Sequence, residues 1–395
     1  MDALIILFHI TAILLLGVLC SMISRKLRLS GVILLLLLGV LLNRLNYNGI
    51  FGLPVSFLAS LAIFALVMVV FDESSKFKLK KFGRVSLTAL KLTITCFVLN
   101  LILLTFFARF VVGIRSIPLA LLFAVLVSGT DTSVILSKFG AVKSKIIDVL
   151  KMESLLSTLL TVLLPFVLLD VWSGFRAGEL AANIFNQVVW LIQHLIIGIG
   201  AGVLIGIVVL KIIKKSYSEL LSPLAVISAA LLSYIISETL GGSGVVAVIT
   251  FGIFFGNIYI KEKAELTNFS SIFVKFLGIV VFILIGLILG FPLDLTFFLS
   301  SLILFVIFLA VRLGSVLFVF KKMNIREKLF ITLNARKGLA AAVVIFMLIT
   351  SIGNICAASL TDSIEILHLA LAFIAYSILL SAITLRFSKY FIGVK

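Results

Sequence analysis

The segment Val127-Ser-Gly-Thr-Asp-Thr-Ser133 lies inside an apolar run, residues 117 to 139, that consists mainly of Leu, Phe, Val and Ile. A glycine, hydroxyl residues and a carboxylate in a hydrophobic helix predict that the helix is broken there. Backbone groups freed by a break are tolerated at membrane depth only where they line a cavity or are buried in protein. Asn334-Ala-Arg-Lys-Gly338 interrupts the run 329 to 350 in the same way. Two interrupted helices in corresponding halves indicate an inverted-repeat transporter whose site lies where they cross.

The composition around these segments is that of a membrane protein. Hydrophobic residues make up 63% of the 395 residues and charged residues 12%, and the mean hydropathy is +1.35. These values exclude a soluble globular domain and leave room for one transmembrane domain over residues 1–395. We predict an all-α integral membrane fold of about 13 transmembrane helices, of about 20 residues each. The candidate spans are 3–23, 29–42, 54–71, 85–107, 117–139, 147–169, 184–210, 219–238, 243–258, 271–290, 295–320, 329–350 and 365–386.

The distribution of basic residues predicts the orientation. The net charge is +17, which could indicate nucleic acid as a partner, but 23 Lys and Arg lie in or beside the connections on one side and 4 on the other. Such a bias is typical of cytoplasmic loops. We therefore expect a multi-pass protein of the cell membrane, with the N-terminus outside, the C-terminus cytoplasmic and no nucleic-acid partner. The run 4–23 has no basic leader, so we expect a retained helix there.

Several charges fall inside the predicted spans. At about 1.5 Å per residue, Asp131, Glu153, Arg312 and Arg336 lie about 9 to 12 Å from the cytoplasmic ends of their spans. Uncompensated charge in hydrocarbon costs at least about 2.5 kcal/mol per residue, so these groups should pair or line a water-filled cavity. They predict a transport site, with Asp131 meeting a cation and Arg336 and Lys337 offsetting the carbonyl ends of the broken helices. The alternative is that they only form static pairs between helices.

A polar stripe on the span 147–169 is expected to face Asp131. Its members share one helical face: Glu153, Ser154, Ser157, Thr158 and Thr161. Oxygen ligands that face a carboxylate suit a hard monovalent cation that loses part of its water shell. The alternative is that each hydroxyl bonds to its own helix, as is common in membranes.

Enzyme chemistry finds little support in the sequence. The histidines His9, His194 and His368 are isolated, no HExxH or GxSxG motif occurs, and Cys20, Cys96 and Cys356 form no CxxC pair. We expect no enzymatic activity, no cofactor and no metal beyond a transported cation.

In order and depth, these motifs resemble those of the monovalent cation:proton antiporter superfamily, in its sodium/proton exchanger branch. Thr130-Asp131-Thr132 is similar to the Thr-Asp-Pro of that branch, and the residues from Glu153 to Thr158 are similar to its Glu-Ser-x-x-Asn-Asp. Further matches are the glycine-rich stretch 241–252, Val311-Arg312-Leu313 and Arg336-Lys337-Gly338. The resemblance covers nearly the whole chain.

The resemblance implies a fold and roles for particular residues. It implies a moving core with helices around 117–169 and 295–350, a dimerisation part that includes 1–71 and 184–258, and a homodimer. Glu153 and Arg312 would form a structural ion pair. Asp131 would line the cation and proton site, with Thr130, Thr132, Ser154, Ser157 and Thr158 beside it.

One departure from the family pattern affects the mechanism. Ser157-Thr158 stands where the family has Asn-Asp, whose carboxylate is usually regarded as the ion carrier. The carrying charge must then come from Asp131, or Glu153 must leave its arginine. We predict exchange of a monovalent cation, Na⁺ first, for H⁺ at Asp131, with one proton per cation and a role in pH homeostasis. The alternatives are a potassium or other-ion transporter of the same fold, a cation-efflux channel, or an ion-binding sensor that lost the carrier acid.

Overall fold

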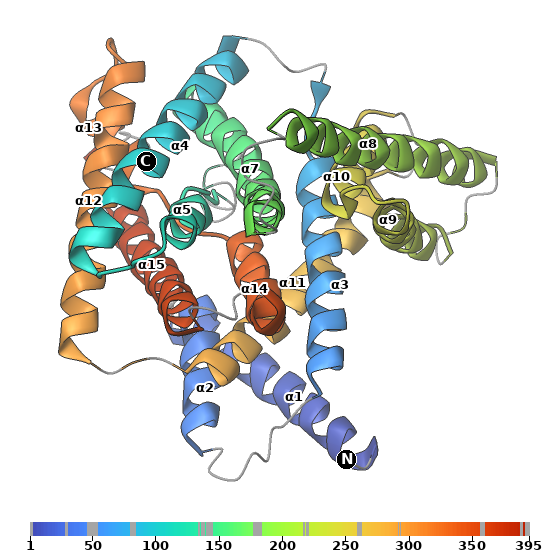
Figure 1. The fold of residues 1–395 in the computed structure, drawn as a ribbon, viewed down its shortest axis with the longest axis horizontal. Helices are drawn as coiled ribbons and strands as arrows, with labels where there is room; N and C mark the ends of the chain where they lie inside the picture. The colour runs from blue at the N-terminus through green and yellow to red at the C-terminus, as the bar shows by residue number, and fades with distance from the viewer. Residues whose placement is uncertain are drawn as a thin grey trace. The chain divides into compact units, whose positions relative to one another are not determined.

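A computed structural model of the chain contains fourteen α-helices among the residues it describes (Figure 1). The described residues are 3–27, 31–45, 54–79, 84–132, 135, 139, 145–176, 184–215, 218, 221–258, 263–290, 292, 294–355, 360–387 and 390–391. The helices are α1 (Ala3–Leu27), α2 (Gly31–Leu45), α3 (Val55–Ser75), α4 (Arg84–Val111), α5 (Ile117–Leu126), α7 (Lys145–Arg176), α8 (Ile184–Lys215), α9 (Leu221–Thr239), α10 (Gly244–Asn257), α11 (Lys263–Leu289), α12 (Leu295–Val319), α13 (Ile325–Leu333), α14 (Leu339–Ile355) and α15 (Leu360–Arg386).

Every predicted span overlaps a helix; the span 117–139 is helical in α5 only as far as Leu126, and the span 329–350 is divided between α13 and α14. By length and composition, eight of the described helices are long and apolar enough to cross a membrane. The shorter apolar helices include α2, α5, α10 and α14, so two of them flank the predicted breaks. The prediction of an all-helical membrane fold is confirmed.

Polar residues set several helix starts that apolar runs alone do not reveal. Helix α13 begins at Ile325 rather than 329, because Asn324 and Glu327 form a reciprocal capping box. Helix α11 begins at Lys263 rather than 271, with Glu265 in its first turn, where a carboxylate favours the positive end of the helix dipole. Helix α5 has Pro118 in its first turn, where no amide hydrogen is needed.

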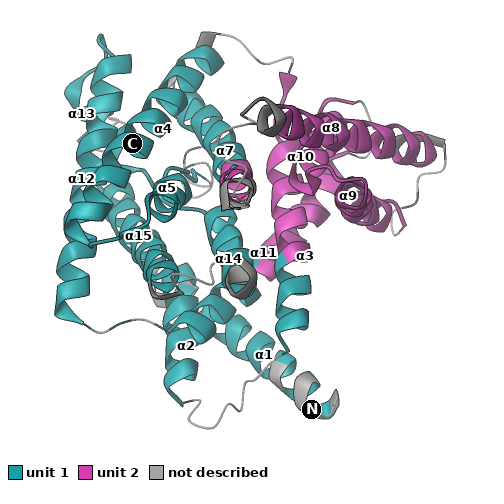
Figure 2. Ribbon diagram, in the orientation of Figure 1, with its two compact units in different colours: residues 1–62, 83–161, 278–395 teal, residues 63–82, 162–277 magenta. Residues whose placement is uncertain are grey.

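The chain forms two compact units (Figure 2). Unit 1 comprises residues 1–62, 83–161 and 278–395, and unit 2 comprises residues 63–82 and 162–277. In unit 1, α4 packs on α5 and α12, and α15 packs on α5, α12 and α14. Buried rings join three of these helices: the Phe373 ring lies 5.2 Å from that of Phe123 and 5.4 Å from that of Phe305, between centroids. Every charged residue of the predicted site belongs to unit 1.

In unit 2, α8, α9 and α10 pack on one another. The glycine-rich stretch 241–252 forms the turn into α10: Gly241 has φ +74°, and Glu238 accepts a hydrogen bond from the Gly244 amide at 2.8 Å. Farther along α10, a Cβ on Gly252 would clash with Ser74 at the end of α3. These glycines therefore serve a tight turn and a close helix contact.

At the end of α3, buried Asp72 holds two polar partners within unit 2. It accepts hydrogen bonds from Ser271 Oγ at 2.7 Å and from Lys76 Nζ at 2.6 Å. Burial lowers the pKa of Lys76, but the carboxylates of Glu73 and Asp72 outweigh it and raise that pKa above its usual value. Lys76 thus stays protonated beside Asp72 at neutral pH.

Candidate functional site

The first predicted break lies directly after α5. The helix ends at Leu126, the amides of Val127 and Ser128 donate to Phe123 O and Val125 O, and residues 129–132 are not helical. The structure confirms an interruption in the span 117–139 at this point. Ser133 and most residues up to 144 lie outside the described part of the chain.

The second break lies between α13 and α14. Helix α13 ends at Leu333, α14 begins at Leu339, and residues 334–338 are not helical. Asn334 closes α13 twice, because both its backbone amide and its Nδ2 donate to Phe330 O, at 3.2 and 2.8 Å. Ser381 Oγ on α15 donates to Asn334 Oδ1 at 3.3 Å. The predicted break is therefore present and is held by α15.

The two breaks meet. The Asp131 amide donates to Arg336 O at 2.7 Å, and Lys337 Nζ donates to Gly129 O at 3.0 Å. A Cβ added to Gly338 would lie 2.6 Å from Asp131 Cβ, so the second break passes directly against the Asp131 side chain. Two segments that are about 200 residues apart in the sequence thus meet at one partly buried carboxylate.

Lys337 is the buried cation of this crossing, with 1% of its surface exposed. Its ammonium group lies 4.0 Å from the centroid of the Phe308 ring on α12, a favourable cation–π distance. Its backbone amide donates to Ser377 Oγ on α15 at 3.0 Å. The sequence predicts that Lys337 lies at a carbonyl end, as it does at Gly129 O. It does not predict the contacts with Phe308 and Ser377, because a phenylalanine or a serine in an apolar span does not indicate a lysine partner.

The hydroxyls of α7 contact the first break. Ser157 Oγ accepts from the Thr130 amide at 3.1 Å, and Ser154 Oγ accepts from the Thr132 amide at 3.2 Å. Ser154 Oγ and Thr158 Oγ1 donate to Thr130 O at 3.1 and 3.4 Å. These hydroxyls supply the hydrogen bonds that the interrupted backbone lacks. All three side chains therefore bind the backbone of Thr130 or Thr132, the two residues next to Asp131 in the sequence.

Two further hydroxyl oxygens at this break have no hydrogen-bond partner within the described residues: Thr132 Oγ1 and Thr161 Oγ1. Each side chain is 1% exposed. A Cβ on Gly129 would lie 2.4 Å from Thr161 Oγ1, so Thr161 also borders the break. Buried hydroxyls without partners are unfavourable unless another group binds them, and an oxygen atom of this kind can ligate a cation.

Glu153 and Arg312 form a buried two-point ion pair. Arg312 Nη1 donates to Glu153 Oε1 at 2.8 Å and Nη2 donates to Oε2 at 3.2 Å. The same guanidinium also donates to Ile331 O on α13 from Nε at 3.4 Å and from Nη2 at 3.2 Å. The pair therefore links α7, α12 and the helix that leads into the second break. Bidentate geometry with further donors satisfied is what a buried arginine requires.

The described histidines have local partners. The His194 ring contacts that of Trp190 in a tilted arrangement with ring centroids 3.7 Å apart, and His368 Nε2 lies 3.0 Å from Leu289 O. No group of three His, Cys, Asp or Glu that could hold a metal ion occurs among the described residues. The side chain of His9 and all of Cys356 lie outside that part of the chain.

A helical membrane bundle in which two interrupted helices cross at a carboxylate belongs to the class of secondary-carrier folds. The model of one family, "Sodium/hydrogen exchanger, transmembrane", matches residues 11–388, and the chain belongs to this family. The family is one of transporters, as the sequence predicted.

A solved structure of the sodium proton antiporter MjNhaP1 from Methanocaldococcus jannaschii at pH 8 is similar in fold. Its TM-score is 0.78 at 20% identity, and the similarity covers 98% of each chain. A structure of the same antiporter from an electron-microscopy map gives a TM-score of 0.72, also at 20% identity, over 99% of this chain and 97% of that one. The chain thus has the MjNhaP1 fold over nearly its whole length.

Two relatives are similar in sequence. The chain is 27% identical over 179 residues to the Na⁺/H⁺ antiporter ApNhaP of Aphanothece halophytica, which is 43% of this chain and 34% of that protein. It is 26% identical over 287 residues to the K⁺/H⁺ antiporter NhaP of Alkalimonas amylolytica, which is 69% of this chain and 47% of that protein. The chain thus spans less than half the length of the curated relatives it matches.

Proposed function

We propose that this protein exchanges a monovalent cation for protons across the membrane, and that the cation and the proton compete at Asp131. The observation that carries the proposal is the crossing of the two breaks at this residue: its amide bonds to Arg336 O, and Gly338 lies against its side chain. Family membership supports the same activity.

Competition at one carboxylate is sufficient for exchange. A carboxylate that holds a proton is neutral and binds a cation weakly, and a bound cation stabilises the ionised carboxylate, so each displaces the other. Thr132 and Thr161 offer buried hydroxyl oxygens near Asp131 that have no other described partner. Ser154, Ser157 and Thr158 hold the break that carries the site. If the protein alternates between inward and outward states, each ligand crosses in turn.

The single-carboxylate mechanism follows from what surrounds the other acid. Glu153 binds Arg312 through both carboxylate oxygens, so its charge is already compensated. Ser157 and Thr158 are neutral. The site would then return with the same charge whether it holds a proton or a cation, which gives one proton per cation and an electroneutral cycle.

The test is proton flux in proteoliposomes after the addition of Na⁺ or K⁺. We expect exchange by the wild type, none by Asp131→Asn, and normal exchange by Asp148→Asn, which removes an exposed carboxylate near the start of α7. Vigorous exchange by Asp131→Asn would exclude competition at this residue. Exchange whose rate depends on an imposed voltage would contradict the electroneutral cycle.

The preferred cation is proposed to be Na⁺. K⁺ is the alternative, because the two sequence relatives are named for different ions. A second candidate function is an ion-binding sensor without flux, which the Ser157-Thr158 sequence in place of Asn-Asp favours. A wild type that Na⁺ stabilises against heat but that moves no protons, with activity gained by Thr158→Asp, would support the sensor.

We also propose the assembly and orientation that the sequence predicts. The protein would be a homodimer in the cell membrane, with the N-terminus outside, the helices around 117–169 and 295–350 moving as a core, and a dimerisation part that includes 1–71 and 184–258. Cross-linking in membranes tests the dimer: we expect links between partners within 184–258 and none between residues of the two core segments.

A further inference from the structure

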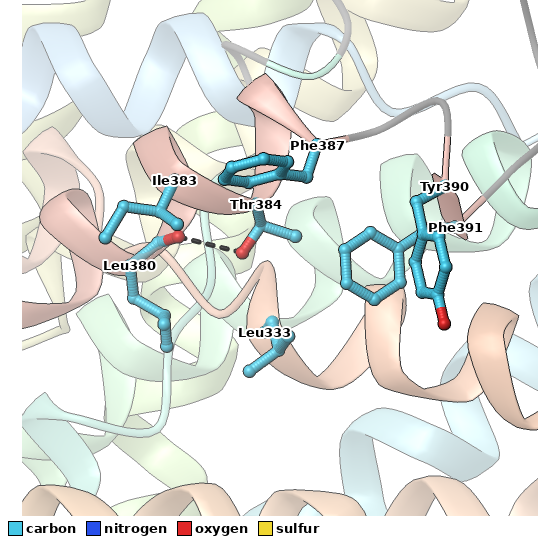
Figure 3. Close-up of a pocket in the computed structure, with 7 residues that line it drawn as sticks. All are labelled: Leu333, Leu380, Ile383, Thr384, Phe387, Tyr390 and Phe391. Carbon is cyan, nitrogen blue, oxygen red and sulfur yellow. Dashed lines mark hydrogen bonds between the residues drawn. The ribbon is translucent and has the colours of Figure 1, made fainter.

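An apolar pocket of about 320 Å³ lies at the end of α15 in unit 1 (Figure 3). Its walls are aliphatic and aromatic: Leu333, Leu380, Ile383, Phe387, Tyr390 and Phe391. The remaining lining residue, Thr384, donates its hydroxyl to Leu380 O at 2.8 Å, as the dashed line in Figure 3 marks. The hydroxyl proton is therefore used within the helix, and the interior of the pocket suits hydrocarbon.

Contacts between aromatic rings hold Phe391 and Tyr390, two of the residues that line the pocket. The Phe391 ring lies 6.1 Å from that of fully buried Phe330 on α13, and 5.5 Å from that of Tyr390, between centroids. The pocket opens at the surface of unit 1, where Ile383 is 57%, Phe387 58% and Tyr390 63% exposed. An occupant could thus enter from outside without unpacking the buried core.

The pocket lies where apolar spans end. The candidate span that contains α15 ends at Arg386, within the lining segment, and that of α12 ends at Val319, shortly before α13. Tyrosine is enriched at the boundary between hydrocarbon and water, and Tyr390 stands at the rim. The interior would therefore face acyl chains and the rim would face headgroups.

The rim carries positive charge. The Arg326 guanidinium lies 4.7 Å from the centroid of the Tyr390 ring, and exposed Arg386 directly precedes Phe387. Exposed Lys321 and Lys322 lie in the connection that leads into α13. The acid of this region, Glu327, already accepts a hydrogen bond from the Asn324 amide at 3.2 Å as part of the helix cap. Cations predominate where a headgroup would lie.

We infer that this pocket is a binding site for an anionic phospholipid. One acyl chain fills the apolar space, and the headgroup phosphate binds Arg326 and Arg386, whose planar guanidinium groups match phosphate oxygens. Leu333, which lines the pocket, is the last residue of α13 and directly precedes Asn334 of the second break. A lipid bound here would touch the helix that carries that break, so its occupancy would also affect exchange if the proposed function holds.

Heat unfolding of the purified full chain in a neutral detergent tests the site by itself, without any transport assay. Dioleoylphosphatidylglycerol is titrated beside dioleoylphosphatidylcholine, which has the same acyl chains and no net charge. We expect a larger rise in the melting midpoint with the anionic lipid. The double variant Arg326→Gln/Arg386→Gln should weaken its apparent affinity by roughly tenfold or more, since two charges are lost.

Two further variants separate a specific site from general charge attraction. Lys26→Gln/Lys211→Gln removes two exposed cations elsewhere and should leave the affinity unchanged. Ile383→Trp fills the mouth of the pocket from an exposed position and should also weaken binding. Equal stabilisation by the two lipids, an equal loss in both double variants, full affinity in Ile383→Trp, or the same effect from sn-glycerol 3-phosphate alone would each overturn the inference.

Discussion

Gly338 allows the second break to pass against Asp131. An alanine methyl group there would lie 2.6 Å from Asp131 Cβ, closer than real contacts allow, and 3.0 Å from its Oδ2. We predict that Gly338→Ala destabilises the protein by about 1 to 3 kcal/mol and slows exchange by roughly tenfold to a hundredfold, because the carboxylate must move. Initial rates of proton flux and the melting midpoint measure both effects.

Gly314→Ala on α12 is the matched control for this substitution. A Cβ at Gly314 meets no atom within 4 Å, and the residue is exposed within a helix, so alanine should be neutral or slightly stabilising. Equal rates for the two variants would show that the contact with Asp131 does not matter.

Arg312 has two sets of partners, and this makes a double-mutant cycle informative. Glu153→Gln leaves Arg312 buried without a counter-charge, at a cost of about 3 to 5 kcal/mol. Arg312→Met loses Ile331 O as well. We predict that the double variant Glu153→Gln/Arg312→Met is more stable than the sum of the single losses, by about 0.5 to 3 kcal/mol of coupling. Unfolding in detergent measures this coupling energy. Strictly additive losses would contradict an energetic coupling between Glu153 and Arg312.

At the scale of the element, the first break depends on α7. Ser157→Ala removes the oxygen that accepts the Thr130 amide, so a buried donor is left without a partner. We predict a loss of about 1 to 3 kcal/mol in stability. Ser233→Ala on α9 is the control: Ser233 is equally buried, but its hydroxyl donates to Ala230 O in its own helix, so the loss should be smaller. Similar losses in the two variants would refute the special role of Ser157.

Both breaks could be predicted from the sequence, because Gly129 to Thr132 and Asn334 to Gly338 are polar in otherwise apolar runs. The hydrogen-bond partners of these two segments could not be predicted from the sequence. A stripe of hydroxyls on one helical face has the same pattern whether it ligates an ion, bonds to its own helix or bonds to a neighbour's backbone. The position of Lys337 over Phe308 likewise depends on how α12 packs, since phenylalanine in an apolar span is ordinary. The apolar run does not predict the start of α13 at Ile325, although the spacing of Asn324 and Glu327 is that of a capping box.

At the scale of the whole molecule, the predicted orientation can be measured directly. In a variant with Cys20, Cys96 and Cys356 replaced by alanine, single cysteines are introduced as Arg115→Cys and Lys211→Cys, both at exposed positions. We predict that a membrane-impermeant maleimide labels Arg115→Cys on intact cells and labels Lys211→Cys only after permeabilisation. The charge bias between the two sides is the reason. The reverse labelling pattern would invert the topology.

The hydrogen bonds of the first break bear on how the protein is made. Segments are synthesised from the N-terminus onward, so the residues of α5 and its break leave the ribosome before Ser154 and Ser157, and long before Arg336, whose carbonyl accepts the Asp131 amide. An interrupted backbone without partners is costly in hydrocarbon. The site can therefore reach its final shape only after Arg336 has been synthesised, and a nascent chain stalled before α13 should hold residues 129–132 in another conformation.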